Sequence, residues 1–163
     1  AVSALFQRVR ADGDSLSAGR HELNVTGGED AEIAGSDSEL LSAVGNLVGN
    51  AIRYTGEGGR IDVSWAWRRD GSGELVVADT GIGIAREHLP RLTERFYRVD
   101  GSRSRESGGT GLGLSIVKHA VQRHGGEIDI ESELGKGSRF RLVFPASRVR
   151  RTGARITPDV ETA

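Results

Sequence analysis

The chain has 163 residues, a length that suits one domain large enough to bury a hydrophobic core. Its formal net charge of −1 gives no overall field that would attract nucleic acid or an anionic membrane. The sequence has no cysteine and no apolar run near the roughly 20 residues of a membrane-spanning helix, whereas its 24 glycines are about twice the usual share of roughly 7%.

The first third of the sequence predicts two helices with two short strands between them. Apolar side chains at helical spacing indicate the first helix, which we expect to stop at the Asp-Gly-Asp sequence of 12–14. Ser36 and Glu39 form a capping box that should begin the second helix. In chain order, these predicted elements cover residues 2–11, 22–25, 31–34 and 37–55.

The remaining sequence predicts two hairpins separated by helices. The predicted elements are strands 60–68 and 74–79, helices 86–95 and 115–124, and strands 127–133 and 138–144. After Pro145 the sequence is basic and short of large apolar side chains, so we expect a disordered tail. This order predicts an α+β fold in which helices cover one face of a mixed, mostly antiparallel sheet.

A run of glycines at 108–114 carries the first sign of function. It follows a segment, 100–107, with almost no apolar side chains, and it leads into the predicted helix at 115–124. Glycines let backbone N–H groups turn toward a ligand, and the first turn of a helix favours anions. The run therefore indicates either a phosphate cradle or an ordinary turn that caps the helix.

Three polar residues are predicted to share one face of the second helix. Asn46, Asn50 and Arg53 are spaced so that their side chains share one face. An amide oxygen is a hard neutral ligand suited to Mg²⁺, which takes its other ligands from phosphates and water, and an arginine one turn further on can meet a phosphate. The alternative is a solvated helix face.

An aspartate stands at the end of the apolar strand 74–79. Asp79 is followed by Thr80, Gly81, Ile82, Gly83 and Ile84. A carboxylate at a strand end, next to glycines that permit close approach, suits an acceptor for an exocyclic amine or a ribose hydroxyl. The alternative is an ordinary Asp-Thr-Gly turn.

The P-loop, the Gly-x-Gly-x-x-Gly fingerprint and the protein-kinase motifs are absent from the sequence. Together, the segments described above resemble the ATP-binding domain of sensor histidine kinases. The resemblance covers about residues 20–145, and the motifs occur in the family's order and spacing. They are Asn46-x-x-x-Asn50-Ala51, Asp79-x-Gly81-x-Gly83, Glu94-Arg95-Phe96-Tyr97-Arg98, Gly109-Thr110-Gly111-Leu112-Gly113-Leu114 and Gly135-Lys136-Gly137-Ser138-x-Phe140.

The resemblance implies a Bergerat-type fold, a two-layer sandwich of about five strands with three helices on one face, that binds ATP and Mg²⁺. Asn50 would hold the metal with Asn46 nearby, Asp79 would accept the adenine amine, and the residues 98–110 would form a lid over the phosphates. The other implied nucleotide contacts are Arg53, Tyr54, Gly81, Gly83, Ile84, Arg98, Arg103, Gly109, Thr110, Gly111, Leu112, Gly113, Leu114 and Ser138.

The implied activity is transfer of the γ-phosphate of Mg-ATP to a histidine on a separate dimerisation and phosphoacceptor domain, for relay to a response regulator. We do not expect this chain to phosphorylate itself, because His21-Glu22-Leu23 lies in a predicted strand rather than an acceptor helix. Two alternatives remain, a stand-alone anti-sigma-type serine kinase and a degenerate docking module.

The expected domain organisation has three parts. Residues 1–15 would be the end of an upstream acceptor-domain helix, 16–147 the ATP-binding domain and 148–163 a disordered tail. The segment itself would be a cytoplasmic monomer without nucleic-acid partners, cut from a homodimeric parent anchored in the bacterial membrane.

Overall fold

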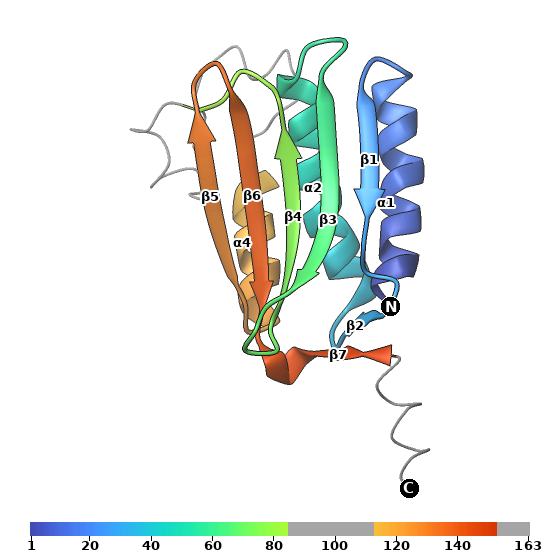
Figure 1. Cartoon of the computed structure of the whole chain (residues 1–163), viewed down its shortest axis with the longest axis vertical. Helices are drawn as coiled ribbons and strands as arrows, with labels where there is room; N and C mark the ends of the chain where they lie inside the picture. The colour runs from blue at the N-terminus through green and yellow to red at the C-terminus, as the bar shows by residue number, and fades with distance from the viewer. Residues whose placement is uncertain (85–112, 153–163) are drawn as a thin grey trace, which may run out of the picture.

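The computed structural model describes residues 1–84 and 113–152, in which helices cover one side of a sheet (Figure 1). Within these two ranges no helix combines the length and the apolar content that crossing a membrane requires. The elements are α1 (Val2–Ser17), β1 (Glu22–Thr26), β2 (Ala31–Ile33), α2 (Asp37–Tyr54), β3 (Arg60–Trp67), β4 (Gly73–Asp79), α4 (Gly113–Arg123), β5 (Glu127–Glu133), β6 (Gly137–Phe144), the short 3₁₀ helix η2 (Ala146–Arg148) and β7 (Val149–Arg151).

The main sheet has five strands in the order β1-β3-β4-β6-β5. Its β3–β4 and β5–β6 neighbours are the two predicted hairpins, and β4 pairs with β6 between them, all antiparallel. Only β1 runs parallel to its neighbour, β3, which makes the sheet mixed. The predicted α+β fold with a mixed, mostly antiparallel five-stranded sheet is therefore confirmed.

The helices α1, α2 and α4 form the second layer of the sandwich (Figure 1). Helix α2 begins as its capping box predicts, because the Ser36 hydroxyl accepts a hydrogen bond from the Glu39 backbone N–H at 3.3 Å. Its apolar face packs on the sheet and is fully buried at Ala43, Val44 and Leu47. The polar face of α2 is thereby directed away from the core.

Helix α1 is longer than the sequence pattern predicts. It continues through 12–14 and ends at Ala18, which adopts left-handed backbone angles. A Cβ at Gly13 would lie 2.8 Å from the side chain of Leu23, so this glycine allows α1 to approach β1 closely. That packing outweighs the helix penalty of about 1 kcal/mol that glycine carries.

The first predicted domain boundary is consequently wrong in position. A division between 15 and 16 would cut α1, and the side chains of Val2, Phe6 and Val9 are part of the same hydrophobic core as α2 and the sheet. Residues 1–15 thus pack as an integral part of this domain.

The expected disordered tail is also wrong for its first residues. Residues 149–151 form β7, which pairs antiparallel with β2 in a separate two-stranded sheet at the lower end of the molecule (Figure 1). Val149 is buried opposite Ile33, and the Arg151 guanidinium lies 4.5 Å from the centre of the Trp67 ring. One apolar side chain and one cation–π contact therefore fix a segment whose composition predicts disorder; 153–163 lie outside the described residues.

Candidate ATP-binding site

Three polar side chains lie side by side where the hydrophobic core ends. Asp79 on β4 pairs with Ser138 on β6, and Ser138 pairs with Ser132 on β5. All three side chains continue the inward-facing pattern of their strands. Two residues away along each strand, on the same face, lie Val77, Phe140 and Ile130, which are in the core or pack against it. We call Asp79, Ser138 and Ser132 the polar row; it crosses the sheet at the upper end in Figure 1.

Asp79 is half-buried at the centre of this arrangement. Burial raises the pKa of the Asp79 carboxyl above its ordinary value, and the backbone N–H groups of Gly81 and Ser138 and the Thr55 hydroxyl partly offset the increase. The Gly81 N–H donates to Asp79 Oδ1 at 2.8 Å. The carboxylate is therefore held in place by backbone donors and can accept further hydrogen bonds from a ligand.

Thr55 is a site residue that the sequence reasoning missed. Its hydroxyl oxygen is buried without a well-formed hydrogen bond to any described group, yet it is near enough to Asp79 to favour the ionised carboxylate. A Cβ on Gly81 would lie 2.8 Å from this hydroxyl and 3.0 Å from Asp79 Oδ1. The only sequence feature that could have pointed to Thr55 is its place directly after the predicted site residue Tyr54, at the end of α2.

The end of α2 contacts the loop after β4. The Ile82 N–H donates to the Tyr54 carbonyl at 3.1 Å, and a Cβ on Gly81 would lie 2.3 Å from the same oxygen. Gly81 is thus required for this close approach, and the predicted site residues Tyr54 and Gly81 are adjacent in the structure.

The loop after β4 also contacts the turn between β5 and β6. Gly83 has a positive φ of 76°, and a Cβ there would lie 2.1 Å from the Glu133 carbonyl oxygen. The Ile82 carbonyl accepts a hydrogen bond from Gly135 at 2.8 Å, and the Ile84 N–H donates to the Ser132 hydroxyl at 2.7 Å. The glycine-containing segment that follows Asp79 and the one at 135–137 therefore meet in the structure.

The predicted row on α2 lies on its partly exposed face. Asn46 and Asn50 are half-buried and Arg53 is exposed, as a ligand-facing row requires. Asn46 Nδ2 donates to the Ser42 carbonyl at 2.8 Å, while Asn50 Oδ1 accepts a hydrogen bond from Arg53. The Asn50 side-chain oxygen, which is predicted to bind Mg²⁺, is therefore hydrogen-bonded to the Arg53 guanidinium in this structure.

Part of the predicted phosphate-binding segment lies outside the described residues. This applies to the helix 86–95, to Phe96 and to Arg98, Arg103, Gly109, Thr110, Gly111 and Leu112. Gly113 is the first residue of α4, and the Leu114 side chain packs against the core. Of this segment, only the start of α4 can be placed relative to the sheet.

Trp65, Trp67 and His21 have structural roles. Trp65 and Trp67 contact edge to face with ring centres 5.4 Å apart, which agrees with the predicted sheet packing. The ring of His21 lies between the Ser17 hydroxyl, 2.9 Å from Nδ1, and the Thr55 carbonyl, 2.7 Å from Nε2. His21 precedes β1 and is not on a helix, which agrees with its rejection as an acceptor.

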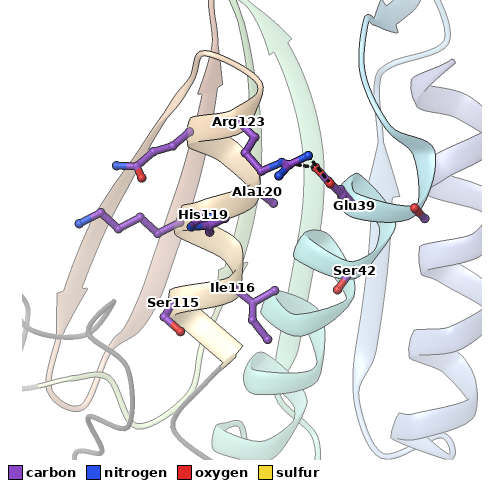
Figure 2. A pocket seen from close by; sticks show the side chains of 10 residues that line it. Glu39, Ser42, Ser115, Ile116, His119, Ala120 and Arg123 are labelled. Atoms are coloured by element: carbon purple, nitrogen blue, oxygen red, sulfur yellow. Dashed lines mark hydrogen bonds and ion pairs between the residues drawn. The ribbon is translucent and has the colours of Figure 1, made fainter.

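A separate groove of about 700 Å³ runs between α2 and α4 (Figure 2). Ile116, His119 and Arg123 of α4 line it opposite Glu39 and Ser42 of α2, and an ion pair of 3.1 Å joins Arg123 to Glu39 at one end. No residue predicted to bind nucleotide lines this groove, so it is distinct from the site around Asp79.

Comparison with known proteins agrees with the fold and with the resemblance to sensor histidine kinases. Residues 35–148 match the family described as "Histidine kinase-, DNA gyrase B-, and HSP90-like ATPase". The chain is 49% identical over 150 residues to the phosphate regulon sensor protein PhoR of Pseudomonas aeruginosa, which covers 91% of this chain and 34% of that protein. It is 47% identical over 113 residues to the sensor-like histidine kinase SenX3 of Mycolicibacterium smegmatis, covering 69% of this chain and 29% of that protein.

Solved structures give the same assignment. The mycobacterial sensor histidine kinase MprB superimposes with a TM-score of 0.79 at 30% identity, covering 88% of this chain and 95% of that chain. Full-length ShkA in complex with AMPPNP superimposes with a TM-score of 0.77 at 26% identity, covering 89% of this chain and 30% of that chain.

The chain belongs to the histidine kinase-, DNA gyrase B- and HSP90-like ATPase family, as a catalytic ATP-binding domain of the sensor histidine kinase type. It spans about a third of the length of the curated relatives PhoR and SenX3.

Proposed function

We propose that this domain binds Mg-ATP at the polar row and transfers the γ-phosphate to a histidine on a separate dimerisation and phosphoacceptor domain, within a two-component kinase. The observation that carries the proposal is the half-buried Asp79 carboxylate, held by backbone N–H groups next to the polar face of α2. A carboxylate at this position supplies the acceptor that the exocyclic amine of adenine needs.

Asn50 is the proposed ligand for Mg²⁺. No group of three or more acidic, histidine or cysteine side chains that could hold a metal occurs in the described ranges, so a neutral amide oxygen would be joined by phosphate and water oxygens. The cation beside it, Arg53, has an exposed side chain and can move from Asn50 to a phosphate when the metal binds. Mg²⁺ would there neutralise phosphate charge.

The residues of this chain would act by positioning and by charge neutralisation. In the transfer, a histidine nitrogen forms a bond to the γ-phosphorus while the bond to the bridging oxygen breaks and ADP leaves. Asp79 would fix the base, and Arg53 would reduce the charge on the phosphates. The position four residues before Asn50 is Asn46, an amide that cannot activate water, so ATP hydrolysis should be slow.

The acceptor histidine is proposed to come from another domain. Both ring nitrogens of His21 have hydrogen-bond partners, Ser17 and Thr55, and His124 is buried with only 3% of its surface exposed. Neither side chain is available to a phosphate without rearrangement of the fold.

Calorimetric titration with ATP, with and without Mg²⁺, tests the site. Binding should require Mg²⁺ for full affinity in the wild-type chain, and Asp79→Asn and Asn50→Ala should each weaken it at least about tenfold. Asp129→Asn and Asn24→Ala are the matched controls and should leave affinity unchanged, because Asp129 lies on the exposed face of β5 and Asn24 lies in β1, which contains no residue of the polar row. Wild-type affinity in both site variants would rule out the assignment.

Labelling with γ-³²P-ATP tests the reaction. The chain alone should not become labelled, and label should appear on a histidine of the acceptor domain of the same kinase when that domain is added. Label on a serine of a partner would support the anti-sigma-type alternative, and absence of nucleotide binding would support a docking module.

A further inference from the structure

We propose that Ser132, to which the sequence assigns no role, is a positioning residue that fixes the direction of the Ser138 hydroxyl proton, so that Ser138 only accepts hydrogen bonds at the base-binding end of the site. This inference rests on the proposed function, since it requires that the purine base of the nucleotide meets Asp79 and Ser138.

The Ser132 hydroxyl contacts three groups from two other segments. Its oxygen lies 2.7 Å from the Ile84 backbone nitrogen, 3.0 Å from the Gly137 carbonyl oxygen and 2.7 Å from the Ser138 hydroxyl oxygen. One side chain on the edge strand β5 thereby ties the loop after β4 to the first two residues of β6.

These contacts determine where the protons lie. A serine hydroxyl has one proton to donate and two lone pairs that accept. The Gly137 carbonyl can only accept, so it takes the Ser132 proton, and the Ile84 N–H can only donate, so it fills one lone pair. The remaining lone pair of Ser132 then accepts from Ser138. If Ser132 instead donated its proton to Ser138, the Ser132 oxygen and the Gly137 carbonyl oxygen would face each other at 3.0 Å without a proton between them.

The base-binding end consequently has no free donor among these groups. The Ile84 N–H is used by Ser132, the Gly81 N–H is used by Asp79, and the Ser138 proton points at Ser132. The Ser138 oxygen and the Asp79 carboxylate present lone pairs to a ligand. A purine with an amino group at position 6 fits such a surface, whereas a 6-oxo group would face acceptors and lose its hydrogen bond.

Removal of the Ser132 hydroxyl should release the Ser138 proton, which can then donate to a 6-oxo group. The test is the ratio of the dissociation constants of ITP and ATP, measured by calorimetry with Mg²⁺ for the full chain. We expect the ratio to exceed one in the wild-type chain and to fall about threefold to tenfold in Ser132→Ala, the value of one hydrogen bond. Ser132→Thr keeps the hydroxyl and should keep the wild-type ratio.

Two further variants serve as a control and as a replacement. Ser64→Ala is the matched control, because Ser64 is a half-buried strand serine of β3 that pairs with Val76, three positions from the Asp79 pair, and it should not change the ratio. If Ser132→Ala does not fold, as judged by circular dichroism, Ser132→Cys replaces it with a group of similar size that hydrogen-bonds weakly.

Each outcome decides the inference. A lower ratio in Ser132→Ala with rescue by Ser132→Thr supports it. An equal loss of ATP and ITP affinity in Ser132→Ala, which a merely structural role would produce, overturns the inference but leaves the proposed function of the wild-type chain standing. The absence of ATP binding in the wild-type chain overturns the proposed function and this inference with it.

Discussion

His124, at the end of α4, accepts a hydrogen bond of 3.0 Å from the backbone N–H of Ser36, which caps the start of α2. Its other ring nitrogen, Nδ1, lies 2.7 Å from the Ala120 carbonyl, so Nδ1 carries the proton and Nε2 accepts. The backbone at Gly35 leaves no room for a Cβ beside this ring. The contact fixes the two helices of the candidate site relative to each other.

His124→Ala should therefore destabilise the domain by about 2–4 kcal/mol, since it opens a cavity in place of the buried ring and leaves the half-buried Ser36 N–H without its partner. Urea unfolding measures the change. His119→Ala is the control, because His119 lies one turn earlier on α4 with an exposed side chain, and it should change stability by no more than about 0.5 kcal/mol. Equal effects of the two substitutions would contradict the proposed role of His124.

Asp79 should make stability fall as pH rises. Because burial raises the pKa of Asp79 above its ordinary value of 3.8, the folded state binds more protons than the unfolded state between the two values. The free energy of unfolding of Asp79→Asn minus that of the wild type should thus increase from pH 3 to pH 7. Chemical unfolding across this range measures it, and a difference independent of pH would show that Asp79 is not desolvated.

Gly81 and Gly45 provide a matched pair of glycine substitutions. Gly81→Ala should destabilise the chain and abolish ATP binding, because its Cβ would lie 2.3 Å from the Tyr54 carbonyl and between Thr55 and Asp79. Gly45→Ala, in the middle of α2, meets no described atom within 4 Å and should stabilise by about 1 kcal/mol. Thermal unfolding and ATP titration separate the two; ATP binding by Gly81→Ala would disprove the close packing at Asp79.

Val149 tests the pairing of β7. Its side chain is 9% exposed opposite Ile33, so Val149→Ala should cost about 1–2 kcal/mol. Arg150→Ala, one residue on, removes only an exposed ion pair with Glu32 and should cost at most about 1 kcal/mol. Urea unfolding of both variants decides whether this segment is part of the fold; a Val149 effect no larger than that of Arg150 would indicate that it is not.

Local chemistry explains what could be predicted. The capping box at Ser36 and Glu39 defined the start of α2, and alternating apolar residues defined the strands of both hairpins. Asp79 was recognisable as a candidate site residue because it is a carboxylate at the end of an apolar strand and is followed by two glycines that permit close approach. These features depend on residues within a few positions of one another, so the sequence displays them directly.

Contacts between distant segments could not be predicted in this way. The β7 strand has a basic composition, yet it is ordered because it pairs with β2 and because Arg151 contacts the Trp67 ring. Helix α1 continues through Gly13 only because Leu23 fills the space beside it. In both places tertiary packing outweighs local preference, which is the usual reason that propensity fails.

The sequence by itself determined the family, the α+β fold and the residues Asn46, Asn50 and Asp79 as candidates for an ATP site, because each is marked by a local motif. Only the tertiary structure placed Thr55 beside Asp79 and Ser132 beside Ser138. Strand register, the close approach of α2 to the loop after β4 and the direction of a hydroxyl proton depend on packing between segments far apart in the chain, and no local pattern encodes them.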